Sequence, residues 1–251
     1  MTLILPARAK LNLDLAVLSR AKDGYHQVRT HIQAVALHDL LELQRADLTT
    51  MTTTGPHRLD PDDNSVRMAH HALEAAAGRE LPTAFHLDKR IPPGSGMGGA
   101  SSDAAATLRA LAAIHHLSTD LRQVATSLGA DVPFFLNGGA ALAQGRGERI
   151  RATATEPAWF AIAWPGIELS TAKVYGAWDE VQGKGPNELR DAAEQVEPRL
   201  RDFAQRLGEA WQMTGSGSAF FLRCDDERSA RDAAIKVDGW AAVTHSVGAW
   251  A

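Results

Sequence analysis

The sequence is poor in cysteine, in net positive charge and in long apolar runs, and each shortage excludes a class of protein. Its 251 residues include one cysteine, Cys224, which rules out an internal disulfide framework and fits a reducing cytoplasm. Lysine and arginine together number 26 against 30 aspartates and glutamates, which gives a formal net charge of −4. Because the basic field of a typical nucleic-acid-binding protein is missing, we expect no nucleic-acid partner.

No apolar run approaches the roughly 20 residues that a membrane-spanning helix needs, so we expect no membrane partner. Residues 1–6 are apolar but too short for the core of a signal peptide, and no basic stretch precedes them. We expect them to form an opening strand of a cytoplasmic protein. The remaining composition, 45% hydrophobic and 22% charged, is ordinary for a globular protein of one large domain or two small ones.

Strand-like and helix-like stretches are interleaved in both halves of the chain, which predicts an α+β fold with two lobes. Residues 10–15 alternate between polar side chains and leucines, as in a half-buried strand. Asn64 can cap a helix that Gly78 ends, since amide side chains suit the first position and glycine suits the last. Residues 45–60 are polar and rich in threonine, which favours a hairpin or a loop.

A glycine-rich stretch interrupts this pattern in the first half of the chain. Four glycines fall within six residues, two serines follow at once, and a helix-forming run begins at Ala104. Glycine lets the backbone approach a ligand closely, and a helix N-terminus offers unpaired N–H groups and partial positive charge. Serine hydroxyls add further donors. We therefore expect this stretch to hold a phosphate group.

Three other interpretations of the glycines make different demands on the sequence. A Walker A loop needs a lysine that bridges the terminal phosphates, and Ala100 stands in its place. A dinucleotide-binding Gly-x-Gly-x-x-Gly pattern is present, with Asp120 as the distant acid, but Asp120 better suits the first turn of a helix. A simple surface turn has no need for two serines at the start of a buried helix. The phosphate site is the interpretation that we adopt.

Four motifs, in order along residues 8–220, resemble those of the GHMP kinases. The glycine stretch is similar to the second motif of that family, and the others fall in residues 8–26, 129–135 and 213–220. The Lys-Leu-Asn and Asp-Gly-Tyr-His segments of the first motif, which includes Asp23, resemble the branch that phosphorylates a cytidine diphosphate derivative of methylerythritol. One departure is Asn187-Glu188-Leu189, which stands where the family often has Asn-Asp.

The resemblance implies a two-lobed GHMP kinase fold. A lobe like domain 2 of ribosomal protein S5 would bind ATP over residues 1–152, and a ferredoxin-like lobe would bind the substrate over residues 153–251. The implied reaction is the ATP-dependent phosphorylation of the 2-hydroxyl of cytidine diphosphate methylerythritol, a step of the non-mevalonate route to isoprenoids. A mevalonate or homoserine kinase is the alternative. We expect Mg²⁺ with the ATP, without an assigned protein ligand, and a monomer or weak homodimer.

The same resemblance implies roles for the matching residues. Asp131 is the expected base towards the substrate hydroxyl, and Lys10 would keep it ionised and stabilise the transferring phosphoryl group. The expected ATP-binding residues are Asn64, for which helix capping is an equal alternative, and the glycine stretch, namely Pro92, Pro93, Gly94, Ser95, Gly96, Met97, Gly98, Gly99, Ala100, Ser101 and Ser102. The expected substrate-binding residues are Asn12, Tyr25, His26, Tyr175, Gly215 and Ser216.

Overall fold

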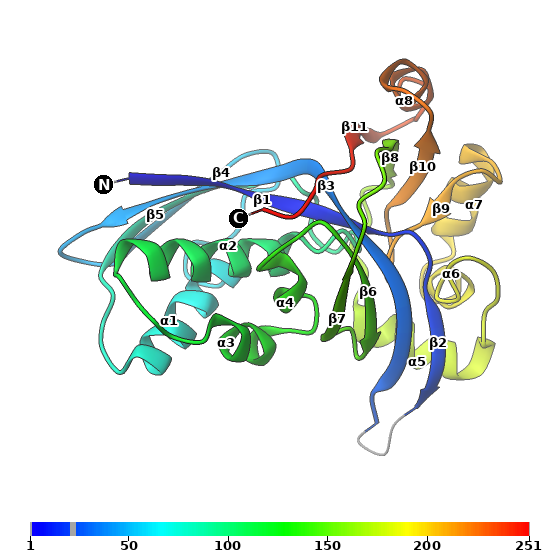
Figure 1. Ribbon diagram of the computed structural model, residues 1–251. Coiled ribbons are helices and arrows are strands. Elements are labelled where there is room, and N and C mark those ends of the chain that lie inside the picture. Colours follow the sequence, from blue (N-terminus) through cyan, green and yellow to red (C-terminus); the bar gives the residue numbers. More distant parts are fainter. Residues whose placement is uncertain (1, 21–23, 251) are drawn as a thin grey trace. The chain divides into compact units, whose positions relative to one another are not determined.

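Two long strands near the start of the chain, β1 (Thr2–Asn12) and β3 (His26–Arg45), each contribute to both of its compact units. The computed structural model, shown in Figure 1, describes residues 2–20 and 24–250. Unit 1 holds residues 2–9, 38–91 and 98–137, and unit 2 holds the others. β1 confirms the expected opening strand over its described residues; Met1 and Asp23 lie outside them. The assignment of an ATP-binding domain to residues 1–152 and a substrate-binding domain to residues 153–251 stays a prediction.

Unit 1 contains the end of β3, which pairs with β5 (Thr83–Asp88) in antiparallel fashion, with Leu41 opposite Leu87. On its other side β5 pairs in parallel with β4 (Thr50–Thr54). The expectation of a hairpin or loop over residues 45–60 is therefore wrong for β4. Its threonines are β-branched, a side-chain shape that favours strands, and β5, its partner, lies too far along the chain for a local pattern to reveal the pairing.

The helices of unit 1 are α1 (Ser65–Ala77), α2 (Gly99–Ile114), α3 (Leu121–Leu128) and α4 (Val132–Phe135). In Figure 1, α1, α2 and α3 lie on one side of this unit's strands. Gly78 ends α1 with φ at 65°, as predicted. Asp120 caps α3 by accepting a hydrogen bond from the backbone N–H of Arg122, so it belongs to a helix start, as expected. Among the described residues, every helix is too short or too polar to span a bilayer.

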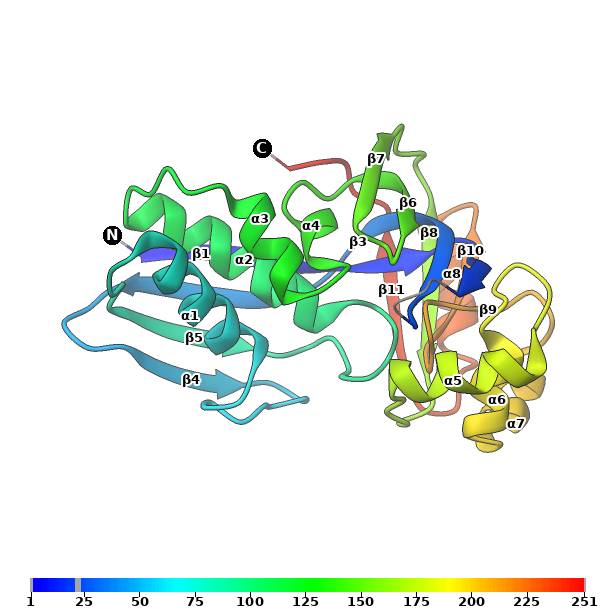
Figure 2. The same cartoon turned by 90° about the horizontal axis from the view of Figure 1, so that it is seen from below.

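Unit 2 contains the first part of β3, which pairs with β2 (Ala16–Arg20) and with β6 (Ala140–Gly145), both antiparallel. β6 continues the ladder to β7 (Arg149–Thr153). The remaining elements, drawn from yellow-green to red in Figure 2, are β8 (Trp159–Trp164), α5 (Thr171–Val181), α6 (Arg190–Val196), α7 (Arg199–Leu207), β9 (Gln212–Met213), β10 (Phe220–Cys224), α8 (Glu227–Ala234) and β11 (Trp240–His245).

The last four strands form an antiparallel sheet in the order β11-β8-β10-β9. Strand, helices, two strands, helix and strand in this order give the ferredoxin-like arrangement that the resemblance implies. One face of the sheet, including Ala161, Ala163 and Phe220, packs in a single apolar cluster with helix residues such as Val174 and Ala230. Side chains of successive strand residues point to opposite faces, so Phe160 and Ile162, also buried, belong to the other face.

Candidate active site

The ammonium of Lys10 lies where three of the four motifs meet, within unit 2. Its Nζ donates hydrogen bonds to the side-chain oxygen of Asn12 and, over 2.8 Å, to the carbonyl oxygen of Gly96. Its backbone N–H donates to the carbonyl oxygen of Met97 at 2.9 Å. The Asn12 amide in turn donates to the hydroxyl of Thr30 at 2.8 Å. Lys10 and Asn12 are both buried, so the polar face of the first strand is an interior site and not a solvated one.

The two glycine turns pack backbone against backbone at this site. A Cβ atom added to Gly96 would overlap the carbonyl oxygen of Thr214, and one added to Gly215 would lie 3.2 Å from both the Lys10 Nζ and the Asn12 Oδ1. The backbone N–H of Asn12 donates to the Thr214 hydroxyl at 2.8 Å. Both glycines also adopt positive φ angles, of 79° and 58°. Glycine is required at each position because neither the space nor the backbone conformation admits a side chain.

Two serines of these turns have structural partners. The Ser95 hydroxyl donates to the carbonyl oxygen of Pro92 at 2.6 Å, and the Ser95 carbonyl accepts from the N–H of Ala219 at 3.0 Å. The Ser216 hydroxyl lies 2.9 Å from that of Thr171, the first residue of α5. The hydroxyls of Ser95 and Ser216 thus hold the two turns in shape. Contact with a ligand is therefore left mainly to the backbone atoms of the turns.

The second half of the glycine stretch belongs to unit 1 and starts α2. Gly98 precedes the helix in the left-handed conformation, with φ at 73°. Ala100 lies in the helix itself, in the ordinary geometry that an alanine requires, and Ser102 closes the first turn through a 2.9 Å hydrogen bond to the Gly98 carbonyl. The N–H groups at such a start lack intrahelical partners and attract anions. Ser101 is half-buried and Ser102 is buried beside them.

His26 and Tyr175 are brought together in unit 2. Their rings stack with centroids 5.2 Å apart and planes inclined by 21°, and the ring of Trp178 meets His26 edge-on. The His26 Nε2 donates a hydrogen bond to the Asp179 carboxylate at 2.7 Å. This bond lowers the pKa of Asp179. The 5.2 Å separation leaves no room for a further ring between the two, because a ring stacked between them would need about 7 Å.

Tyr25, which directly precedes His26, lies against Arg146. Its side chain is 57% exposed, and the guanidinium of Arg146 lies 3.9 Å from the centre of its ring. Stacking of a planar cation on an aromatic ring is a favourable arrangement that also rigidifies the ring. Asp23, which opens the same motif, lies outside the described residues.

Asp131 immediately precedes the short helix α4 in unit 1. The residue is half-buried, and its carboxylate makes no capping hydrogen bond to that helix. Acids at helix starts ordinarily serve as caps, so a structural role as the cap of α4 does not account for this one. Lys10 belongs to unit 2, and the pairing of Asp131 with Lys10 stays a prediction.

Asn64 is the cap of α1. Its Oδ1 accepts from the backbone N–H groups of Val66 and Arg67, at 3.0 and 3.2 Å. Its Nδ2 donates to the carbonyl oxygens of Asp60 and Pro61, at 2.7 and 3.0 Å. The capping alternative is therefore confirmed. A nucleotide contact by this side chain would have to replace one of these bonds, and the ATP-binding role stays a prediction.

One group of potential metal ligands occurs among the described residues, formed by His70, His71 and Glu74 of α1. The His70 Nε2 lies 3.0 Å from the carbonyl oxygen of Leu81 and 3.2 Å from a Glu74 oxygen. Leu81 also donates its N–H to Glu74 at 2.8 Å. These contacts attach α1 to the segment that leads into β5. A group with two histidines does not suit Mg²⁺, which prefers oxygen ligands.

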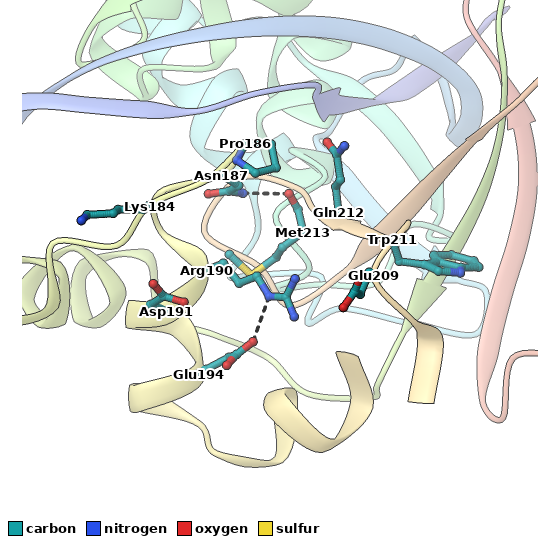
Figure 3. Close-up of a pocket in the computed structure, with 10 residues that line it drawn as sticks. All are labelled: Lys184, Pro186, Asn187, Arg190, Asp191, Glu194, Glu209, Trp211, Gln212 and Met213. Atoms are coloured by element: carbon teal, nitrogen blue, oxygen red, sulfur yellow. Dashed lines mark hydrogen bonds and ion pairs between the residues drawn. The ribbon is translucent and has the colours of Figure 1, made fainter. Parts of the chain in front are cut away.

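A cavity of about 280 Å³ in unit 2 reaches Met213, at the start of the motif over residues 213–220, and Figure 3 shows its lining. Asn187 forms part of its wall and is buried. Its Nδ2 donates to the carbonyl oxygens of Met213 and Gly215, at 2.7 and 2.9 Å, and its Oδ1 accepts from the N–H of Leu189 at 3.0 Å. Asn187 begins the segment that departs from the family pattern, and its side chain binds the backbone of the glycine turn.

The chain resembles known kinases over nearly its whole length. Residues 64–139 match the family model for the GHMP kinases N terminal domain. The chain is 36% identical over 253 residues to the 4-diphosphocytidyl-2-C-methyl-D-erythritol kinase of Chromohalobacter salexigens, covering 91% of this chain and 85% of that protein. It is 37% identical over 237 residues to the kinase of the same name from Ectopseudomonas mendocina, covering 87% and 81%.

Solved structures give the same result for the fold. A crystal structure of 4-(cytidine 5'-diphospho)-2C-methyl-D-erythritol kinase matches with a TM-score of 0.83 and 33% identity, covering 98% of this chain and 100% of that one. A crystal structure of mevalonate kinase matches with a TM-score of 0.65 at 13% identity, which shows a shared fold alone.

Proposed function

Because the chain belongs to the family of 4-diphosphocytidyl-2-C-methyl-D-erythritol kinases within the GHMP kinases, we propose that it phosphorylates the 2-hydroxyl of that cytidine diphosphate compound with ATP. The reaction is a step of the non-mevalonate route to isoprenoids. The observation that carries the proposal is the meeting of Asn12, Gly96 and Gly215, from three separate motifs, around the Lys10 ammonium. A buried cation between two glycine turns suits the transfer of a charged phosphoryl group.

Asp131 and Lys10 are proposed to carry the chemistry. A carboxylate is a weak base towards an alcohol, but phosphoryl transfer through a loose transition state needs only an oriented hydroxyl whose proton is taken late. Lys10 would stabilise the negative charge on the transferring group, because an ammonium aimed at developing charge in a water-poor site is effective there.

The glycine stretch is proposed to hold the phosphates of ATP, in two parts. Residues 98–102 would contribute the N–H groups at the start of α2 and the hydroxyls of Ser101 and Ser102. Residues 92–97 would contribute backbone atoms, since the Ser95 hydroxyl already has a partner in Pro92. Asn64 is proposed to contact ATP from its place at the start of α1.

The substrate is proposed to bind along unit 2. Tyr25, His26 and Tyr175 would hold the cytosine, by stacking and by hydrogen bonds to its edge. In the tautomer that donates from Nε2 to Asp179, the Nδ1 atom of His26 is an acceptor, which suits the amino group of cytosine. Asn12, Gly215 and Ser216 would contact the remainder of the substrate.

We propose that Mg²⁺ accompanies ATP and is held by phosphate oxygens and water, since the potential ligand group at His70 does not suit it. No step of the reaction is assigned to it. We further propose that the chain acts in the cytoplasm, as a monomer or weak homodimer.

A coupled assay for ADP formation tests the function. Wild-type enzyme is expected to turn over with ATP and 4-diphosphocytidyl-2-C-methyl-D-erythritol, and to show only background ADP release with mevalonate or homoserine. The Lys10→Met variant, matched in length and lacking the charge, serves as the control for a contaminating kinase. Turnover with mevalonate or homoserine in place of the cytidyl compound would assign the chain to another GHMP activity, and nucleotide binding without any turnover would make it a binding module.

A further inference from the structure

A cluster of three charged side chains is buried in unit 1 beside the glycine stretch. The Lys89 Nζ donates hydrogen bonds to a carboxylate oxygen of Asp39 and, over 2.8 Å, to Oδ2 of Asp103. Lys89 is 2% exposed, and both aspartates are fully buried. Buried ionic groups are costly to desolvate, and a hydrophobic replacement often folds as well, so stability alone is a poor reason for such a cluster.

The cluster connects the two segments of unit 1 that flank the glycine stretch. Asp39 lies on β3, and its second oxygen accepts the backbone N–H groups of Arg90 and Ile91, at 2.6 and 2.7 Å. Those residues lead directly into the glycine stretch. Asp103 lies on α2, one residue beyond Ser102. Lys89 therefore fixes the first turns of α2 to the segment that precedes the stretch.

The Lys89 ammonium also lies next to Gly99, the first residue of α2. A Cβ atom added to Gly99 would be 2.9 Å from the Lys89 Nζ. The positive charge is thus placed at the same helix start whose N–H groups would face the triphosphate. At this distance in a buried site, with little water to screen it, the charge adds to the potential of the helix end.

A negative charge on Asp103 would oppose phosphate binding, and the ammonium of Lys89 offsets that charge. An ionised carboxylate beside the N-terminus of a phosphate-binding helix would repel the phosphate. Its Oδ1 is buried and has no hydrogen-bond partner among the described residues. Burial raises the pKa of Asp103 to about 8. Burial also acts to lower the pKa of Lys89, but the carboxylates of Asp103 and Asp39 outweigh it, and the pKa of Lys89 is raised.

We propose that Lys89 is a positioning residue for ATP: held between Asp39 and Asp103 behind Gly99, its ammonium fixes the start of α2 and cancels carboxylate charge there, so that the helix end attracts the triphosphate. The proposal rests on the proposed function, in which this helix start holds ATP. It predicts that the cluster governs nucleotide affinity and leaves the affinity for the alcohol substrate unchanged, whereas a purely structural cluster would affect both or neither.

The test replaces the ion pair without changing the net charge. In the double variant Lys89→Met with Asp39→Asn, the amide oxygen can still accept the two backbone N–H groups. The dissociation constant of a non-hydrolysable ATP analogue, measured by titration calorimetry, is expected to rise about tenfold, while that of the cytidyl substrate changes less than about twofold. Lys236→Met, at an exposed lysine, is the control. A folded double variant with wild-type affinity for the analogue would overturn the proposal.

A second variant covers the case in which the first does not fold. Asp103→Asn removes a titrating carboxyl that faces Lys89 and Asp39. In wild-type protein, Asp103 loses its proton as the pH rises through about 8, the cluster gains a negative charge, and affinity for the analogue is expected to fall. The variant is expected to lack this fall. Coincident pH profiles would overturn the proposal.

The two proposals fail differently. Wild-type protein that binds the analogue but does not phosphorylate the cytidyl compound would refute the assigned reaction, and the comparison of dissociation constants would still test Lys89. Wild-type protein that binds no analogue under any condition would overturn both.

Discussion

The side-chain nitrogen of Asn187 donates a hydrogen bond to the carbonyl oxygen of Gly215 over 2.9 Å. The second N–H of the same amide donates a hydrogen bond to the carbonyl oxygen of Met213, a contact drawn in Figure 3. Asparagine suits this position because its amide supplies two donors and one acceptor at the right length. The glycine turn that lies against Lys10 is therefore also held by the amide of Asn187.

The Asn187→Asp substitution tests this relationship with almost no change of shape. A carboxylate would place oxygen against two carbonyl oxygens in a buried site, which we expect to cost about 3 kcal/mol of unfolding free energy. Denaturant titration measures that loss, and steady-state kinetics should show a raised KM for the cytidyl substrate. The control is Asp191→Asn, at an exposed acid on the same cavity, with an expected effect within about 0.5 kcal/mol. An Asn187→Asp protein as stable as wild type would contradict the account.

Gly96→Ala should damage both stability and catalysis. The new Cβ would overlap the Thr214 carbonyl, so the two turns must separate, at a cost of about 3 kcal/mol. Because the Gly96 carbonyl accepts from Lys10, the ammonium would also move, and kcat should fall by about tenfold or more. Gly166→Ala is a matched control: its φ of 74° is close to the 79° of Gly96, but nothing lies within 4 Å of the added atom. We expect it to lose only about 1 kcal/mol and to keep its activity. Equal losses in the two variants would mean that backbone strain, and not the contact, limits Gly96.

Tyr25→Ala is expected to raise the KM for the cytidyl substrate by about tenfold, since stacking on one base contributes about 1 to 3 kcal/mol. The KM for ATP should not change. Tyr25→Phe keeps the ring and its contact with the Arg146 guanidinium, and should restore the wild-type value. An unchanged KM in the alanine variant would remove Tyr25 from the substrate site.

Asp131→Asn keeps the size of the side chain and removes its basicity. Loss of the group that accepts the substrate proton should reduce kcat by about a hundredfold or more, with little change in either KM. A variant with near-normal turnover would exclude Asp131 as the base.

Local signals in the sequence predicted the elements whose determinants are local. The start of α1 is predicted by its capping residue Asn64 and its end by Gly78. The start of α3 is predicted in the same way by its capping residue Asp120. β4 was missed because what makes it a strand is its partner β5, which lies about thirty residues further along the chain, and composition does not encode pairing over that range.

The same distinction applies to the site. The glycine stretch and Lys10 stand out because glycine runs and an alternating polar face are visible in a few residues. Asn187 and Lys89 carry no such signal, since each acts on groups far away in the sequence, Gly215 in one case and Asp39 in the other. The division of the glycine stretch between the two units after Met97 likewise depends on tertiary contacts alone.

The hydrogen bond between Asn12 and Thr214 joins two residues that are far apart in the sequence. On the ribosome, Lys10 and Asn12 emerge early, but Thr214 and Gly215 follow some two hundred residues later, and Val35 pairs with Ser246 later still. Unit 1 ends at Asn137 and can complete its core during synthesis, since domains fold as units from the N-terminal side. The cluster around Lys10 has no such early route, because a ribosome stalled before residue 214 carries Lys10 and Asn12 without the glycine turn at Gly215 that contacts them.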